Sequence, residues 1–282
     1  MRKRTTLFAT ALAVLLTACP AARQPGQPLT PGFNLFSPQQ DVELGREAAA
    51  QVSGQVDVVS DPALQNYVRT IGQRLAAQPG AGNFPYTFTL VNDSSINAFA
   101  LPGGPIFLHT GLIANAENEA QVAGVIAHEI SHVALRHGTS QVSRAYVAQL
   151  PAVLAGVTVG GTMLGQLAQL GVGLSTTGLL LSYSRSAEAE ADALGARIMA
   201  DAGYNPIEMA RFFERLEVAG APRAPEFLST HPRPGNRIRM VQAEIQAMPP
   251  RQFTAGTGQF QRMQQLVAQL PPPRRPAVAG VR

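Results

Sequence analysis

The sequence predicts a mostly helical α+β fold with a small antiparallel sheet beside a central helix. Three observations predict it. Residues 86–91 and 106–110 alternate apolar and polar side chains as strands do. Residues 125–138 have a helical pattern, and further helical patterns follow one another from residue 182 onwards. With 282 residues, 45% of them hydrophobic, the chain is long enough for one sizeable core.

The N-terminus has the features of an export signal. Residues 1–18 combine a basic start with an apolar run that is short for a membrane span. The next motif resembles a bacterial lipobox, whose cysteine is lipidated and becomes the new N-terminus: Leu16, Thr17, Ala18 and Cys19. Cys19 is the only cysteine of the chain. We therefore expect a lipid anchor at Cys19, and the alternative is an ordinary signal peptide with an unrelated cysteine.

Composition divides the rest of the chain into three parts. Residues 19–37 are rich in Pro, Gly and Gln, which predicts a flexible tether. Residues 38–248 predict the folded domain. Residues 249–282 turn again to Pro, Gln and Gly, which predicts one short helix at residues 259–270 and a disordered tail. The formal net charge is +4 and the basic residues are scattered, so we expect no nucleic-acid partner.

A helix accounts for the stretch between Asn115 and Gly138. Asn115 is a suitable N-cap and acidic residues follow it in the first turn. Arg136 and His137 stand before Gly138, as expected for the end of a helix. We interpret His137 as a cation that the C-terminal end of the helix dipole favours.

The same helix carries two histidines and a glutamate in one short pattern. His128 and His132 are four residues apart, so they lie one above the other on a helix and can both bind one zinc ion. Glu129 lies beside them and can accept the proton of a water that the metal activates. The alternative is a pair of helical histidines that hydrogen bonds satisfy.

A catalytic zinc ion needs a third protein ligand. His137 does not have the metzincin spacing. Residues 182–203 predict a second polar helix that carries Glu188 and Asp192 on one face, with alanines between them. Glu188 can be the third ligand, and Asp192 can hydrogen-bond the far nitrogen of a zinc-bound histidine and fix its tautomer. The alternative for Glu188 is a solvated surface position.

The segment between the two polar helices, residues 145–183, contains no charged side chain. Its pieces of about fifteen residues are short of the ~20 that a membrane-spanning helix needs. We expect apolar helices that cover the metal site or touch a lipid surface, and the alternative is a membrane hairpin. Beyond it, Gly203 ends the second polar helix, and Asn205 to Glu208 begin another with capping-box chemistry.

Four motifs in this order resemble the gluzincin metallopeptidase family that includes HtpX, the periplasmic protease BepA and the CAAX prenyl protease. They are NAFALPGGPIFLHTGLI, HEISH, SRSAEAEADALG and STHPRPGNRI, and the resemblance covers residues 40–240. It implies a zincin-type metalloprotease domain with one zinc ion per chain, bound by His128, His132 and Glu188, and with Glu129 as general base. No helical-repeat region like that of BepA follows, and a lipobox stands where integral members have a membrane span. The substrates of these relatives are therefore not carried over.

The resemblance implies a zinc endopeptidase, here a bacterial lipoprotein of the cell envelope that faces the periplasm or another extracytoplasmic space. We expect it to hydrolyse unfolded or misassembled exported proteins, in protein quality control. The alternative is a metal-holding chaperone or assembly lipoprotein that binds unfolded chains with little cleavage. The intact Glu129 argues against this alternative, because a protein that only binds needs no general base.

The segment before the histidine helix fits this interpretation. A turn at residues 102–105 joins the predicted strands, and a substrate peptide can add to the exposed edge at residues 97–100. The alternative is a plain structural hairpin. We expect His109 to be a strand residue that binds no metal.

His231 is the last histidine to be explained. Pro232 restricts it to extended conformations, which places its side chain on a loop. It can donate a hydrogen bond to the oxyanion, or it can bind zinc in the fourth position and keep the enzyme latent. We expect His231 to approach the zinc in the resting enzyme, and the alternative is a surface loop histidine. Arg237 is the companion candidate for oxyanion stabilisation, with a surface ion pair as its alternative.

Overall fold

The computed structural model describes residues 23–154, 174–175, 178–179, 183–218, 226–231, 236–254 and 256–274. The predicted export signal, the lipidation site Cys19, most of the uncharged segment and the last eight residues lie outside this part of the chain. Within the described residues, no helix is long and apolar enough to cross a bilayer.

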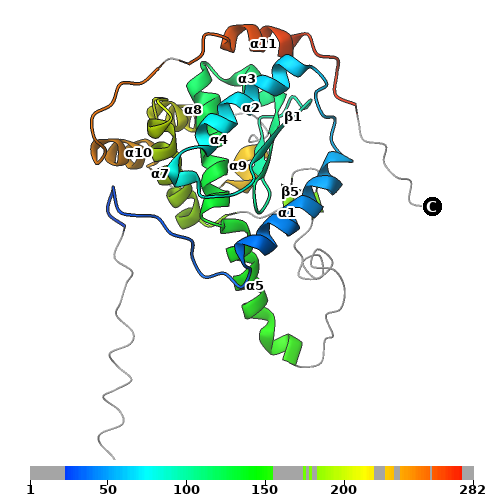
Figure 1. Cartoon of the computed structure of the whole chain (residues 1–282), viewed down its shortest axis with the longest axis vertical. Helices are drawn as coiled ribbons and strands as arrows, with labels where there is room; N and C mark the ends of the chain where they lie inside the picture. Colours follow the sequence, from blue (N-terminus) through cyan, green and yellow to red (C-terminus); the bar gives the residue numbers. More distant parts are fainter. Residues whose placement is uncertain are drawn as a thin grey trace, which may run out of the picture.

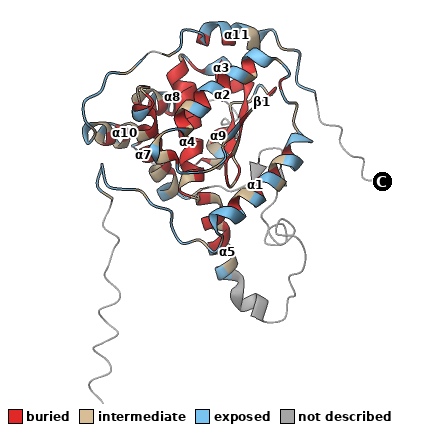
Figure 2. Ribbon diagram, in the orientation of Figure 1, coloured by how far each residue is buried: buried red, intermediate tan, exposed pale blue. Residues whose placement is uncertain are grey.

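Helix α4 (Glu119–Ala134) runs through the middle of the fold, with other helices around it (Figure 1). It packs against α7 (Arg185–Asp201), α8 (Ile207–Val218) and α2 (Pro62–Ala76). All its residues except the last are buried, as the red ribbon in Figure 2 shows. Polar side chains on α4 are therefore held inside the core, where each needs a partner.

The small sheet contains β1 (Thr87–Val91), β2 (Ala98–Ala100) and β3 (Pro105–His109) in the order β1-β3-β2. β2 pairs with β3 antiparallel, but β1 pairs with β3 parallel. The expected antiparallel sheet is therefore a mixed sheet. β2 does not pair with β1 but lies on the other side of β3. The two longer strands, β1 and β3, are therefore neighbours that run in the same direction. β2 is one of the two edge strands, as the expected peptide-binding edge requires.

The start of α4 differs from the prediction by one turn. Asn115 ends the short helix α3 (Thr110–Asn115), and its side chain donates to Gly111 O at 2.8 Å. Asn118 is the N-cap of α4, because its Oδ1 accepts from the backbone N–H of Gln121 at 3.0 Å. Both asparagines can cap a helix, and the sequence did not show that a separate helix precedes α4.

The end of α4 also differs from the prediction. Arg136 takes a left-handed conformation with φ 57°, which breaks the helix before Gly138. Its side chain donates to Asp41 Oδ2 at 2.6 Å and holds this conformation. His137 then begins a new helix, α5 (His137–Leu154), so our interpretation of His137 as a cation at a helix C-terminus is wrong.

The second polar helix forms as predicted. The side chain of Ser184 accepts from Ala187 N at the start of α7, and Gly203 follows its end with φ 83°. α8 then begins where Asn205 Oδ1 accepts from Ile207 N at 3.2 Å. Two more helices complete this side of the domain, α9 (Glu226–Thr230) and α10 (Arg237–Gln246).

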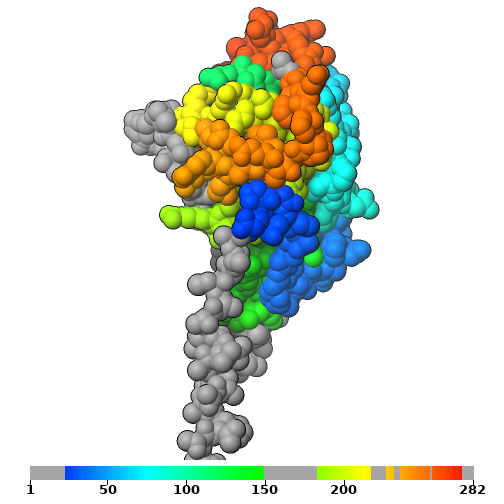
Figure 3. Space-filling view, turned by 90° about the vertical axis from the view of Figure 1, so that its left-hand side faces the viewer, coloured from blue at the N-terminus to red at the C-terminus, as the bar shows by residue number. Residues whose placement is uncertain are grey.

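The segment that we expected to be a flexible tether is described from Arg23 onwards, and there it lies against the domain. Arg23 and the backbone N–H of Gly26 both bond to Glu244 of α10. Figure 3 shows this blue segment beside the orange α10 region. The segment then follows α5, where Leu35 N donates to Ser143 Oγ at 2.9 Å.

The remaining elements complete the periphery. A capping box at Ser37 starts α1, and the predicted C-terminal helix, α11, buries Phe260 and Met263 against the core. The bounds of these elements are α1 Pro38–Ser53, the 3₁₀ turn η2 Pro79–Ala81, β4 Leu174–Ser175, β5 Gly178–Leu179 and α11 Phe260–Ala268.

Candidate metal centre

Four metal-binding side chains from three parts of the chain meet beside α4. His128 and His132 come from α4, Glu188 from the first turn of α7, and His231 from the residue after α9. One ligand atom of each lies within 4.8 Å of the others, and all four residues are buried. The structure thus brings together the three expected zinc ligands and the expected fourth donor.

The spacing of these atoms fits a single zinc ion. The Nε2 atoms of His128 and His132 are 3.0 Å apart, and each lies 3.4 Å from an oxygen of Glu188. Donor atoms of a tetrahedral zinc site, with bonds of ~2.0–2.1 Å, are separated by about 3.3 Å. Two histidine nitrogens and a carboxylate also suit zinc by their chemistry.

The charge of the cluster also favours a divalent cation. Glu129, Glu188 and Asp192 are buried there, and Arg237 is the buried guanidinium beside them. These carboxylates outnumber the guanidinium in a region of low dielectric, where uncompensated negative charge is costly. A zinc ion held by the ligands would offset this charge.

The carboxylates also affect the histidines. Burial alone would lower the pKa of His128, but hydrogen bonds to Asp192 and Glu188 outweigh it and raise this pKa to about 9. Burial lowers the pKa of His132 well below its usual range, so this imidazole is neutral and can bind a metal through a lone pair. Without metal, His128 therefore carries a proton that a metal ion has to displace, whereas His132 presents a neutral donor.

Asp192 and Arg237 hold the ligands in place. Asp192 Oδ1 lies 3.0 Å from Nδ1 of His128, which leaves Nε2 of that ring directed at the site. Arg237 donates from Nε to Asp192 at 2.6 Å and from Nη2 to Glu188 at 3.0 Å. Its guanidinium also lies 4.2 Å from the centre of the Phe213 ring. Arg237 therefore forms a buried pair of salt bridges, and the surface ion pair that we weighed is wrong.

His231 lies at a bend directly after the short helix α9, outside a helix as expected. Its backbone N–H donates to Phe227 O at 2.9 Å, and its ring stacks on Phe227. Nδ1 lies 3.1 Å from Glu188 Oε1 and 3.2 Å from His128 Nε2. This burial excludes the alternative of a surface histidine.

Comparison with known proteins agrees with this geometry. The model of Peptidase family M48 matches residues 62–245. The chain belongs to peptidase family M48. It is 34% identical over 220 residues to the beta-barrel assembly-enhancing protease of Escherichia coli K12, covering 75% of this chain and 45% of that protein. The protein of the same name from Yersinia pestis is 34% identical over 242 residues, covering 80% and 49%.

A mitochondrial protein is also similar to this chain. The metalloendopeptidase OMA1 of Schizosaccharomyces pombe is 32% identical over 178 residues, covering 62% of this chain and 51% of that protein. The chain thus spans about half the length of these relatives. The gluzincin resemblance is confirmed, and zinc is the metal that this family and this donor set indicate.

In this M48 chain, Glu129 is buried beside the metal ligands. Its Oε1 has no hydrogen-bond partner among the described residues and lies 3.4 Å from His231 Nε2. Burial raises the pKa of Glu129, and the backbone N–H of Ala100, in the edge strand β2, hydrogen-bonds to its carboxylate. Oε1 of Glu129 therefore faces His231 and makes no hydrogen bond to the described residues.

Two residues at the site were missed by the sequence reasoning. Tyr183 stacks on the ring of His132, with 4.0 Å between ring centres, and its backbone N–H donates to Thr230 O. His137 Nδ1 lies 3.0 Å from Nδ1 of His132. The five-residue spacing of His132 and His137 was visible, but an uninterrupted helix would have placed the two side chains on different faces. His109 ends β3, as expected, and bonds to Ser95 Oγ.

Proposed function

We propose that this chain is a zinc metalloendopeptidase that hydrolyses unfolded or misassembled proteins of the cell envelope. The observation that carries the proposal is the position of Glu129, a buried carboxylate beside three zinc ligands, whose Oε1 accepts no hydrogen bond from the described residues. A site that only stores metal has no need of this group. The printed names of the M48 relatives, a beta-barrel assembly-enhancing protease and a mitochondrial metalloendopeptidase, support the same class of reaction.

The chemistry follows from the residues present. Zinc, when bound, supplies the positive charge that polarises the scissile carbonyl and makes a water acidic. Glu129 Oε1 takes the proton of the attacking water and later gives it to the leaving amine. Burial raises the pKa of Glu129, which makes the protonated form easier to reach during this transfer. Arg237 Nη1, buried and without a partner among the described residues, is the candidate donor to the oxyanion.

The edge strand β2 is the proposed binding site for the substrate backbone. Ala100 joins this edge directly to the general base, because its backbone N–H bonds to Glu129. A peptide that adds to β2 therefore passes beside the ligands. Main-chain hydrogen bonds fix the register of an extended peptide without selecting its sequence, which suits unfolded substrates.

His231 is proposed to close the site in the resting enzyme. Its ring lies among the ligands, and it is buried in contact with Glu188 and His128. As a fourth donor it occupies the position that a water needs for catalysis. Substrate binding at β2 must then move the end of α9 away from the ligands.

Glu129→Gln tests the proposed function. The variant should bind zinc as the unaltered protein does, because Glu129 is not a ligand. It should lose about 10²–10⁴-fold in kcat for an unfolded protein such as casein, because the general base is gone. Zinc content and casein cleavage are measured on the same preparations.

Glu188→Ala is the matched control, since it removes a ligand and should lower the zinc content. Casein cleavage retained in Glu129→Gln would contradict the mechanism. A zinc-loaded wild-type protein that binds casein and never cleaves it would instead favour the chaperone.

We also propose that lipid at Cys19 tethers the enzyme to a membrane of the envelope, facing the periplasmic or another extracytoplasmic space. The lipobox and the single cysteine support this. Cys19→Ser should leave the protein soluble or as an unprocessed precursor, as cell fractionation would show. Equal incorporation of labelled palmitate into this variant would contradict the anchor.

A further inference from the structure

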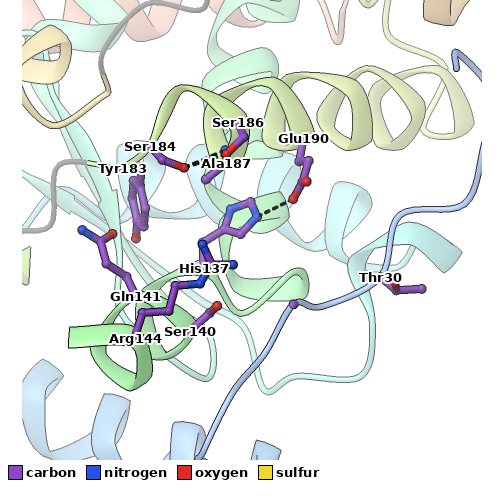
Figure 4. A pocket seen from close by; sticks show the side chains of 11 residues that line it. Thr30, His137, Ser140, Gln141, Arg144, Tyr183, Ser184, Ser186, Ala187 and Glu190 are labelled. Carbon is purple, nitrogen blue, oxygen red and sulfur yellow. Dashed lines mark hydrogen bonds and ion pairs between the residues drawn. The ribbon is translucent and has the colours of Figure 1, made fainter. Parts of the chain in front are cut away.

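On the side of the His132 ring that faces away from the other ligands, His137 contacts the ring and Glu190 contacts His137. No zinc-ligand motif includes these two residues. Nδ1 of His132 lies 3.0 Å from Nδ1 of His137, at the start of α5. Nε2 of His137 lies 3.2 Å from Oε2 of Glu190, on α7. Figure 4 shows His137 and Glu190 directed at each other across the opening between α5 and α7.

The hydrogen positions in this chain of contacts follow from metal binding. If Nε2 of His132 binds the metal, Nδ1 carries the proton and must donate it. Nδ1 of His137 is the acceptor, so the proton of the neutral His137 ring is on Nε2, where it donates to Glu190. One tautomer of each ring satisfies every contact.

The two zinc-binding histidines of α4 are therefore supported differently. His128 bonds to Asp192, a fully buried carboxylate that Arg237 fixes from the other side. His132 reaches its carboxylate only through His137, and the side chain of Glu190 is 44% exposed. Glu190 and His137 line a pocket of about 300 Å³ together with Ser184, Ser186 and Arg144. The contacts that lead from His132 through His137 to Glu190 therefore reach a surface pocket, whereas Asp192, the partner of His128, lies in the core.

We propose that His137 and Glu190 are positioning residues for the zinc ligand His132. His137 holds the imidazole of His132 in the tautomer and orientation that direct Nε2 at the metal, and Glu190 holds His137. This inference rests on the proposed function, because it requires His132 to bind zinc. Without His137 the ring can turn about its Cβ–Cγ bond, and Nε2 is no longer fixed before the metal arrives.

Zinc affinity measured by competition with a chromophoric chelator tests the inference. Loss of such a supporting residue typically weakens metal binding by about 10–100-fold, and His137→Ala should fall in this range. His137→Asn can place its amide oxygen where Nδ1 stood and should recover much of the affinity. His137→Gln, whose amide reaches the position of Nε2, should not recover it. Glu190→Ala should weaken binding by a smaller factor than His137→Ala.

Two further measurements separate positioning from a general loss of structure. The metal-free variants should unfold thermally as the metal-free wild-type protein does, so that only the stabilisation by added zinc is reduced. The visible spectrum of the cobalt(II)-substituted protein should change in His137→Ala and return toward wild type in His137→Asn. Arg144→Ala, in the same pocket but outside these contacts, is the matched control and should bind zinc normally.

The outcomes are distinct. Wild-type zinc affinity in both His137→Ala and Glu190→Ala would overturn the inference and leave the proposed function intact. Equal affinities of His137→Asn and His137→Ala would also overturn it. A wild-type protein that binds no zinc would overturn the proposed function as well. If His137→Ala does not fold, Glu190→Ala decides.

Discussion

Two buried carboxylates at the metal centre, Glu129 and Glu188, have pKa values that their surroundings shift in opposite directions. Burial would raise the pKa of Glu188, but His231, His128 and His132 outweigh it and keep this pKa well below its usual range. At Glu129 the nearby histidines His231 and His128 do not outweigh the effect of burial, so its pKa is raised. One side chain therefore remains an anion suited to binding a metal, while the other is suited to exchanging a proton.

His231→Ala is the prediction at the scale of one residue. If His231 closes the resting site, its removal should raise basal casein cleavage, because a coordination position becomes available to water. Initial rates of the zinc-loaded variant and wild-type protein are compared at equal zinc content. A fall in kcat with unchanged KM would contradict closure and assign His231 to the oxyanion.

Close helix crossings place the ligands at the scale of elements. α4 meets α8 at Gly124 and α7 at Gly195, where side chains would hold the helices apart. A Cβ atom at Gly124 would lie 2.7 Å from Cβ of Met209 and 2.8 Å from its Cα. At Gly195 the nearest atom, the backbone N of His128, would be 3.3 Å away. The crossing of α4 and α8 is therefore the less tolerant of the two.

Gly124→Ala should lower the free energy of unfolding by about 1–3 kcal/mol, because the backbone of α8 has to move. Gly195→Ala is the matched control. The added Cβ of Gly195→Ala would make only a mildly tight contact with the backbone of α4, and alanine favours a helix over glycine by ~1 kcal/mol. Gly195→Ala should therefore destabilise the protein less than Gly124→Ala. Urea unfolding of both metal-free variants gives the comparison. A larger loss in Gly195→Ala would show that the crossing of α4 and α7 is the tighter one.

The N-terminal segment links distant parts of the whole molecule. Glu244 of α10 accepts from Arg23 and Gly26 of this segment and from Arg197 of α7. Burial would raise the pKa of Glu244, but these hydrogen bonds outweigh it and lower the pKa. The anionic form of Glu244 thus stabilises the attachment of residues 23–27 to the domain.

Because the pKa of Glu244 is lower in the folded protein, its contribution to stability is complete above the unfolded pKa of about 4.3. It is lost as the pH falls through the folded value. The difference in unfolding free energy between wild type and Glu244→Gln should therefore be largest near neutral pH and shrink below about pH 4. Urea unfolding of the metal-free proteins across this range measures it. Glu43→Gln, in an exposed pair with Arg46, is the control and should show a much smaller difference. A difference independent of pH would contradict the role of the Glu244 anion.

The sequence by itself determined the features that depend on local geometry. Residues four apart lie on one face of a helix whatever surrounds it, so His128 and His132 were paired correctly, with Glu129 beside them. The same rule placed Glu188 and Asp192 one turn apart on α7. The motifs of the family then placed these two helices in one site, and the mostly helical α+β fold is as predicted.

Only the tertiary structure decided which distant groups meet. Asp192 contacts His128 across 64 residues, and His231 does so across 103. The parallel pairing of β1 with β3 and the burial of Arg237 depend on such long-range packing, as does the contact of His137 with His132. A left-handed residue, Arg136, turns the chain between these two histidines, and its conformation is held by Asp41, 95 residues away. No spacing along the chain encodes that contact, because it depends on where α1 packs in the finished fold.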